Sequence, residues 1–134
     1  MITEILSDFS VKIQEKKISV TVDITDKKTL STNKDYAYIF LANIIWNAVK
    51  YNVSWWEITI NFSGNKLQII DTWIGISGKN IWKIFNRFFK WDESRNSEWF
   101  GIWLSLVKKI ADIYKWKISV TSKKDKGTTF VIIF

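Results

Sequence analysis

Residues 33–52 are apolar on nearly every side, and this segment limits what the rest of the chain can build around it. Its apolar residues recur at helical spacing and leave no wide polar face: Ile39, Leu41, Ile44, Ile45, Ala48 and Val49. A helix of this kind is stable in water only when other elements cover it. Asn33 stands at its start and is a favourable N-cap residue. The sequence therefore predicts a buried helix over residues 33–52.

Three other segments predict strands that could cover this helix. Residues 17–24 alternate Ile18, Val20, Val22 and Ile24 with polar residues, which predicts a strand with one buried face. Residues 57–71 predict a hairpin that turns at Gly64–Asn65. A second hairpin is expected near the C-terminus, with its turn at residues 124–127.

Two further segments, residues 3–15 and 102–114, carry apolar residues at helical spacing. The order of elements predicts an α/β (α+β) fold, a two-layer sandwich in which a mixed, mostly antiparallel sheet carries helices on one face. A length of 134 residues is enough for one domain, and we expect residues 1–134 to form it. Residues 76–100 have weak periodicity, and loops of that length are usually functional, so we interpret them as a lid.

The composition excludes several kinds of chemistry. The chain has no Cys and no His, which excludes thiolate nucleophiles, zinc–thiolate sites and a Ser-His-Asp triad. It contains no run of about 18 apolar residues that could span a membrane, and its first residues carry acids and no long apolar segment, so no signal peptide is expected. The formal net charge is +7, but the 20 basic residues are scattered. This pattern is typical of a solvated surface, although an anionic partner such as nucleotide phosphate or nucleic acid would also fit it.

Four polar residues share one face of the predicted buried helix. Asn43, Asn47, Lys50 and Tyr51 are spaced at i, i+4, i+7 and i+8. Amide oxygens are suitable ligands for Mg²⁺, and a lysine ammonium neutralises phosphate charge. The alternative is that the amides bond neighbouring backbone and that Lys50 points into solvent.

Two other positions suggest a ligand only weakly. Asp71 ends a strand, where its carboxylate could accept a hydrogen bond from a ligand amine or could cap the following helix. Gly101 precedes the helix at 102–114, and backbone N–H groups at a helix start can bind an anion.

Four segments in order, "NIIWNAVKYN", "DTWIGI", "IFNRFFK" and "EWFGIWLSLVKK", resemble motifs of the catalytic ATP-binding domain of bacterial sensor histidine kinases, in the GHKL ATPase superfamily. The resemblance runs from about residue 5 to the C-terminus. It implies a Bergerat-type ATP-binding fold, with ATP and Mg²⁺ as cofactors. The implied activity is transfer of the ATP γ-phosphoryl group to a His on a separate or missing dimerisation domain.

The resemblance also implies roles for individual residues in its first segment. In "NIIWNAVKYN", Asn47 would ligate Mg²⁺, Asn43 would line the pocket, Lys50 would contact phosphate, and Tyr51 would pack near the adenine.

The later segments imply further contacts. Asp71 would bond the adenine amino group, with Gly75 and Ile76 beside it, and Phe85 would anchor the lid, where Arg87 would contact phosphate. The resemblance places three more residues in the nucleotide site: Gly101, Leu104 and Thr128. From the resemblance, the expected catalytic residues are Asn47, Lys50 and Arg87.

The implied partners follow from the same family. A response regulator would be reached through the parent kinase, and no contact with nucleic acid or membrane is expected of this segment. We expect a cytoplasmic location, with a parent kinase that can be membrane-anchored. Two alternatives stay open: a degenerate binding module without catalysis, or a standalone GHKL serine/threonine kinase or ATPase.

The chain departs from the family pattern at tryptophans. Trp73, Trp99 and Trp103 stand where the family has glycine, and Trp116 follows a helix where a left-handed glycine cap is expected. Trp55 falls in an apparent turn. Degeneration, deliberate alteration, or translation of UGA glycine codons as tryptophan would each produce such a chain. Because these departures are all of one type, tryptophan in place of glycine, we favour the explanation by UGA codons.

Overall fold

The computed structural model describes the chain except for residues 26–29, 53–54, 73–80, 87–99 and 124–125. For residues 82 and 100–103 it describes the backbone only. Most of the predicted lid, residues 76–100, therefore lies outside the described residues. The exceptions are the short 3₁₀ helix η1 (Ile81–Lys83) with the three residues after it, and Phe100.

A five-stranded sheet forms one layer of the molecule, in the order β1-β2-β3-β5-β4. The strand bounds are Ser19–Ile24 (β1), Glu57–Ser63 (β2), Lys66–Asp71 (β3), Lys117–Lys123 (β4) and Gly127–Ile133 (β5). β1 pairs with β2 in parallel, and every other pairing is antiparallel. The predicted mixed, mostly antiparallel sheet is confirmed.

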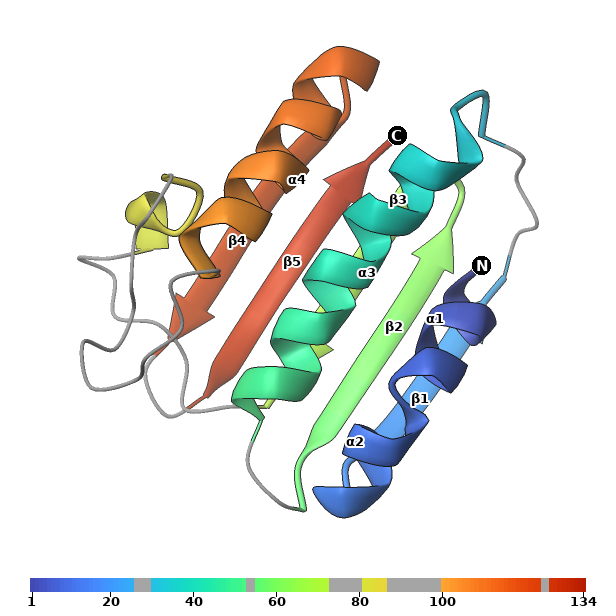
Figure 1. Ribbon diagram of the computed structural model, residues 1–134, viewed down its shortest axis with the longest axis vertical. Coiled ribbons are helices and arrows are strands. Elements are labelled where there is room, and N and C mark those ends of the chain that lie inside the picture. Colours follow the sequence, from blue (N-terminus) through green and yellow to red (C-terminus); the bar gives the residue numbers. More distant parts are fainter. Residues whose placement is uncertain (26–29, 53–54, 73–80, 87–99, 124–125) are drawn as a thin grey trace.

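Helices form the second layer, and all of them cover the same face of the sheet (Figure 1). They are α1 (Ile2–Asp8), α2 (Ser10–Glu15), α3 (Lys34–Tyr51) and α4 (Phe100–Tyr114). α3 crosses the middle of the sheet, with α4 on one side and α1–α2 on the other (Figure 1). The two-layer sandwich predicted from the sequence is confirmed. Within the described parts of the chain, no helix has the length and apolar character needed to cross a bilayer.

α3 is the buried helix predicted over residues 33–52. Asn33 is its N-cap, and its Oδ1 accepts the backbone N–H groups of Asp35 at 2.8 Å and Tyr36 at 3.2 Å. Phe40, Ile44 and others are fully buried against the sheet. The apolar surface of α3 thus joins both layers into one core.

Both predicted hairpins are present, and each turn uses a glycine in the left-handed region. Gly64 has φ +61° and open space around it, whereas Gly127 has φ +94° and lies against the end of β3. A Cβ added to Gly127 would lie 2.0 Å from the carbonyl oxygen of Asp71. Glycine is therefore required at position 127 by contact as well as by conformation.

Two predictions about the N-terminal third were wrong in part. The helix expected over residues 3–15 is interrupted at Phe9, which has φ −97° and ψ 4°, so that α1 and α2 are separate. β1 does not have one buried face, because Val22 and Ile24 are 40% and 44% exposed. β1 is an edge strand, and Ile18, the residue just before it, is buried.

The end of α4 corrects the prediction about Trp116. Its left-handed residue is Lys115, with φ +57°, and Trp116 follows it. The N–H of Trp116 donates to Ala111 O at 2.8 Å and that of Lys115 to Asp112 O at 3.3 Å, which is a Schellman arrangement. The indole of Trp116 is half-buried and lies 4.9–5.1 Å from three aromatic rings, those of Phe40, Tyr114 and Phe134. Trp116 is thus a packed aromatic residue and does not occupy the left-handed position.

Trp55, unlike Trp116, itself occupies a left-handed backbone position. It lies in the turn before β2 with φ +73°, and its side chain is 75% exposed with the ammonium of Lys17 above the ring. A bulky residue in this backbone region is strained, so the inference that glycine suits this turn is supported.

Candidate functional site

Asp71 and Thr128 lie side by side where β3 ends and β5 begins. They are paired in the antiparallel ladder, and the backbone N–H of Thr128 donates to Asp71 Oδ1 at 3.1 Å. Both residues are buried, Asp71 at 5% and Thr128 at 3% exposed. Both are nucleotide contacts predicted from the sequence, although they are 57 positions apart. A buried carboxylate held in this way is an oriented hydrogen-bond acceptor.

Ser122 on β4 holds the other side of Thr128. The two hydroxyl oxygens are 2.9 Å apart, and Ser122 Oγ donates to the carbonyl oxygen of Gly127 at 3.0 Å. Ser122 is not among the site residues predicted from the sequence. Its position directly across the ladder from Thr128 could have been inferred only once the strand register was known.

The two amides predicted on α3 have different surroundings. Asn43 is half-buried, and its Nδ2 donates to Ile39 O at 2.6 Å, so this side chain bonds neighbouring backbone, as the alternative interpretation expected. Asn43 also lines the groove between α3 and α1–α2, beside Phe9 and Trp46. Asn47 is 8% exposed, and among the described residues its buried Nδ2 has no hydrogen-bond partner. An unpaired buried amide is costly unless a ligand completes it.

Lys50 and Tyr51 form the last turn of α3. Lys50 is half-buried, and burial lowers the pKa of its ammonium below the ordinary value. Its Nζ lies 5.5 Å from the centroid of the Tyr51 ring. A phosphate at this position would favour the charged form and would offset the cost of burial.

These residues gather at one end of the sandwich. The last turns of α3 lie at the same end as the beginning of β5 (Figure 1), where Thr128 pairs with Asp71. Polar groups from three elements thus converge on the region where the resemblance places ATP.

Of the remaining predicted nucleotide contacts, the structure describes some and not others. Leu104 on α4 is buried at 3% exposed, and Phe85 is half-buried against the core. Gly101 is the second residue of α4, which begins at Phe100, so its backbone N–H belongs to the helix start and the expected anion site there stays a prediction. Gly75, Ile76 and Arg87 lie outside the described residues.

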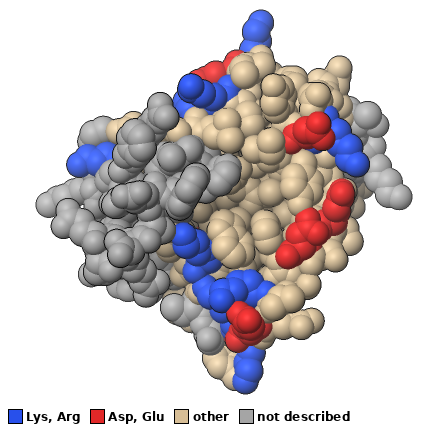
Figure 2. All heavy atoms as spheres, viewed as in Figure 1, with Lys and Arg blue, Asp and Glu red and all other residues tan. Residues whose placement is uncertain are grey.

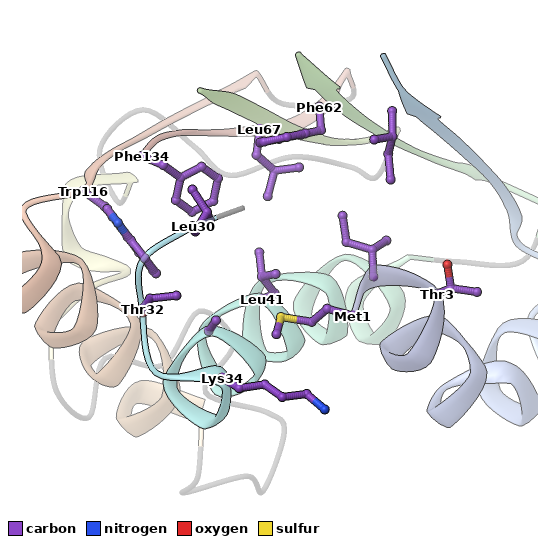
Figure 3. Close-up of a pocket in the computed structure, with 13 residues that line it drawn as sticks. Met1, Thr3, Leu30, Thr32, Lys34, Leu41, Phe62, Leu67, Trp116 and Phe134 are labelled. Atoms are coloured by element: carbon purple, nitrogen blue, oxygen red, sulfur yellow. The ribbon is translucent and has the colours of Figure 1, made fainter. Parts of the chain in front are cut away.

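An apolar cavity of about 500 Å³ lies at the other end of the molecule (Figure 3). Its walls include Leu30, Leu41, Leu67, Trp116 and Phe134, and it contains none of the predicted nucleotide contacts. Ala37 lines it ten residues before Asn47 on α3, which corresponds to about 15 Å along the helix axis. We therefore do not assign the nucleotide to this cavity.

The described surface carries both signs of charge. On the face that Figure 2 shows, Lys side chains are interspersed with Asp and Glu, and the described part of that face has no large region of one sign. This distribution supports the interpretation of the +7 charge as a solvated surface.

Comparison with known proteins gives one consistent family. The model of the family described as histidine kinase-, DNA gyrase B-, and HSP90-like ATPase matches residues 32–134. The heme sensor protein HssS of Staphylococcus saprophyticus is 30% identical over 140 residues, covering 100% of this chain and 29% of HssS. The sensor histidine kinase YclK of Bacillus subtilis is 26% identical over 125 residues, covering 89% of this chain and 26% of YclK. This chain therefore spans less than a third of the length of these relatives.

Solved structures agree with the fold. The mycobacterial sensor histidine kinase MprB has a TM-score of 0.80 at 19% identity, covering 99% of this chain and 94% of that one. The catalytic domain of the histidine kinase ThkA has a TM-score of 0.77 at 21% identity, covering 98% and 86%. The family match covers the central helix, the β3–β5 strand ends and α4, which carry the described site. The chain belongs to the family of histidine kinase-, DNA gyrase B- and HSP90-like ATPases.

Proposed function

We propose that this chain is the ATP-binding catalytic domain of a two-component sensor histidine kinase. The observation that carries the proposal is the end of the sandwich where the buried pair Asp71–Thr128 lies near the turns of α3 that carry Asn47 and Lys50. The family match and the sensor kinases among the relatives support it.

One set of residues would bind the adenine of ATP, and a second set would bind its phosphates. The Asp71 carboxylate would accept the adenine amino group, while the N–H of Thr128 holds that carboxylate in place. Tyr51 would pack near the adenine, and Lys50, with Arg87 from the lid, would contact the phosphates. The lid would close over the nucleotide and exclude water.

Asn47 fits a role as a ligand of Mg²⁺ that arrives with the nucleotide. Its buried amide has an unpaired polar atom, and rotation of the amide by 180° presents its oxygen at the same place. Among the described residues no group of three acidic side chains could hold a metal alone. Mg²⁺ is commonly held by one or two protein ligands together with phosphates and water, where it neutralises phosphate charge.

The chemistry requires a second polypeptide or a further domain. The chain has no His, so the acceptor imidazole would come from a dimerisation domain. The bond between the γ-phosphorus and the β–γ bridging oxygen would break, a phosphorus–nitrogen bond would form, ADP would leave, and the imidazole would lose a proton. The chain's contribution is positioning and charge neutralisation. A response regulator would receive the phosphoryl group next, on the cytoplasmic side, where ATP is available.

Calorimetric titration with Mg-ATP tests the proposal. The chain as printed is compared with a variant that carries Trp73→Gly, Trp99→Gly and Trp103→Gly, and the gene is read for UGA at these codons. Binding by the glycine form, with transfer of labelled phosphate to a supplied dimerisation domain, is the expected result. If neither form binds ATP, the proposal is wrong and the degenerate binding module stands. Labelling of the chain itself at Ser or Thr would favour a serine/threonine kinase instead.

A further inference from the structure

The ammonium of Lys16 binds the end of α3. Lys16 follows α2, and its Nζ donates to three backbone carbonyls of α3 and its C-cap: Val49 at 3.0 Å, Asn52 at 2.7 Å, and Lys50. The side chain is half-buried, and the residues it joins are up to 36 positions apart in sequence.

These contacts satisfy groups that a helix cannot satisfy by itself. The last four carbonyls of an α-helix have no partner within the helix, and the helix dipole makes this end negative. A cation that bonds two of these carbonyls and that of the C-cap therefore both completes their hydrogen bonds and complements the dipole. The last turn of α3 is held by Lys16 as well as by its own backbone.

The same turn carries the proposed phosphate contacts. The backbone carbonyl of Lys50 accepts a hydrogen bond from the Lys16 ammonium, and Asn47 lies one turn earlier on the helix. The C-cap Asn52 is 2% exposed and donates through Nδ2 to Glu57 O at 3.4 Å, while the carbonyl of Lys16 accepts the N–H of Trp55 at 3.2 Å. Lys16 thus joins α2, the end of α3 and the turn before β2.

We propose that Lys16 is a positioning residue for the phosphate end of the nucleotide site. It holds the last turn of α3 in the orientation that presents Lys50 and Asn47 to the phosphates, without touching the nucleotide itself. The adenine end depends chiefly on Asp71 and Thr128, which are held by the β3–β5 ladder and not by Lys16. Tyr51 is the one proposed adenine contact on the last turn of α3. This inference rests on the proposed function.

The test compares ATP with adenosine, because only ATP uses the phosphate end. In Lys16→Met, we expect the Kd for Mg-ATP to rise about tenfold, while that for adenosine changes by less than about twofold. Titrations are run well below the unfolding transition, so that all variants are folded. Lys16→Arg, whose guanidinium keeps the charge and several donors, should recover most of the ATP affinity.

Lys12→Met is the matched control. Lys12 is also on α2, but its ammonium pairs with Glu15 at 2.9 Å on the surface and does not contact α3 in any described interaction. We expect its ATP and adenosine affinities to equal those of the unmodified chain. If Lys16→Met does not fold, Lys16→Gln replaces it, because the amide keeps two donors and loses the charge.

The outcomes separate the inference from the proposed function. Equal weakening of ATP and adenosine in the Lys16 variants would show a merely structural role and would overturn the inference. Unchanged ATP affinity would overturn it as well. If neither the unmodified chain nor its glycine form binds ATP, the proposed function fails first and the positioning role falls with it.

Discussion

Gly127→Ala tests the packing that brings β3 and β5 together at the site. The new methyl carbon would lie 2.0 Å from Asp71 O, 2.9 Å from its carbonyl carbon and 2.9 Å from the Cα of Thr72. Ordinary contacts of a Cβ begin near 3.4 Å, and all three atoms belong to the backbone, so no side chain can rotate away. The start of β5 would have to move away from the end of β3.

The cost has two parts. An L-residue in the left-handed region costs roughly 1–2 kcal/mol, and Gly127 has φ +94°. Overpacking adds typically about 1–3 kcal/mol. We therefore expect Gly127→Ala to lower the free energy of unfolding by roughly 3 kcal/mol, measured by urea denaturation. ATP affinity should fall as well, because the shift would separate Thr128 N–H from Asp71 Oδ1.

Gly64→Ala is the matched control. Gly64 also has a left-handed φ, +61°, in the turn of the other hairpin, but nothing lies within 4 Å of its added Cβ. Gly64→Ala should lower the free energy of unfolding by about 1 kcal/mol, because only the cost of an L-residue in the left-handed region applies. If Gly127→Ala costs no more than Gly64→Ala, the close approach of the strand ends is not as described, and the reasoning is refuted.

Four other substitutions probe the caps, the tryptophans and the site. Asp71→Asn should weaken Mg-ATP binding by about 1–3 kcal/mol in calorimetry, since it removes a charged acceptor, and unchanged affinity would contradict its assigned role. Asn33→Ala should lower the free energy of unfolding by about 1 kcal/mol through loss of the α3 cap. Trp55→Gly should raise it by roughly 1 kcal/mol by relieving a positive φ, and a decrease would show that the Lys17 contact matters more. Trp116→Gly should lower it by about 3–5 kcal/mol, because the indole packs against three rings, and a stabilised variant would restore the glycine hypothesis there.

Local features of the fold could be predicted from the sequence. The N-cap at Asn33 and the turn at Gly64 depend on residues next to one another, so their signals are complete within a few positions. The exposure of Val22 and Ile24 could not be predicted in this way. Alternation indicates a strand, but whether its apolar face is covered depends on the position of β1 at the sheet edge.

In the site, too, features that depend on distant parts of the chain could not be predicted from the sequence. Asp71 and Asn47 could be selected because their residue types match a known motif, but the bond from Thr128 to Asp71 depends on the β3–β5 register. Nothing in the sequence distinguishes Lys16, because a lysine after a short helix is common. Its role becomes visible only in the structure, where α3 ends beside it. At Trp116 the error was one residue. With no glycine at either position, nothing in the sequence distinguishes Lys115 as the left-handed residue.

The parallel pairing of β1 with β2 has a consequence for the order of folding. The β2–β3 and β4–β5 hairpins join neighbouring segments and close short loops, whereas β1 reaches β2 only after the whole of α3 has been traversed. Closing such a long loop is slow, because its entropy is lost before its contacts form. The β3–β5 pairing closes a longer loop, with Asp71 and Thr128 57 positions apart, but each of its strands also belongs to a hairpin, whereas β1 belongs to none. The N-terminal third therefore docks without a neighbouring hairpin to support it, and its opening should be the lowest-energy partial unfolding of the chain. Hydrogen exchange at the β1 amides would then be faster than at β3 or β5, and each such opening would also free the end of α3 from Lys16.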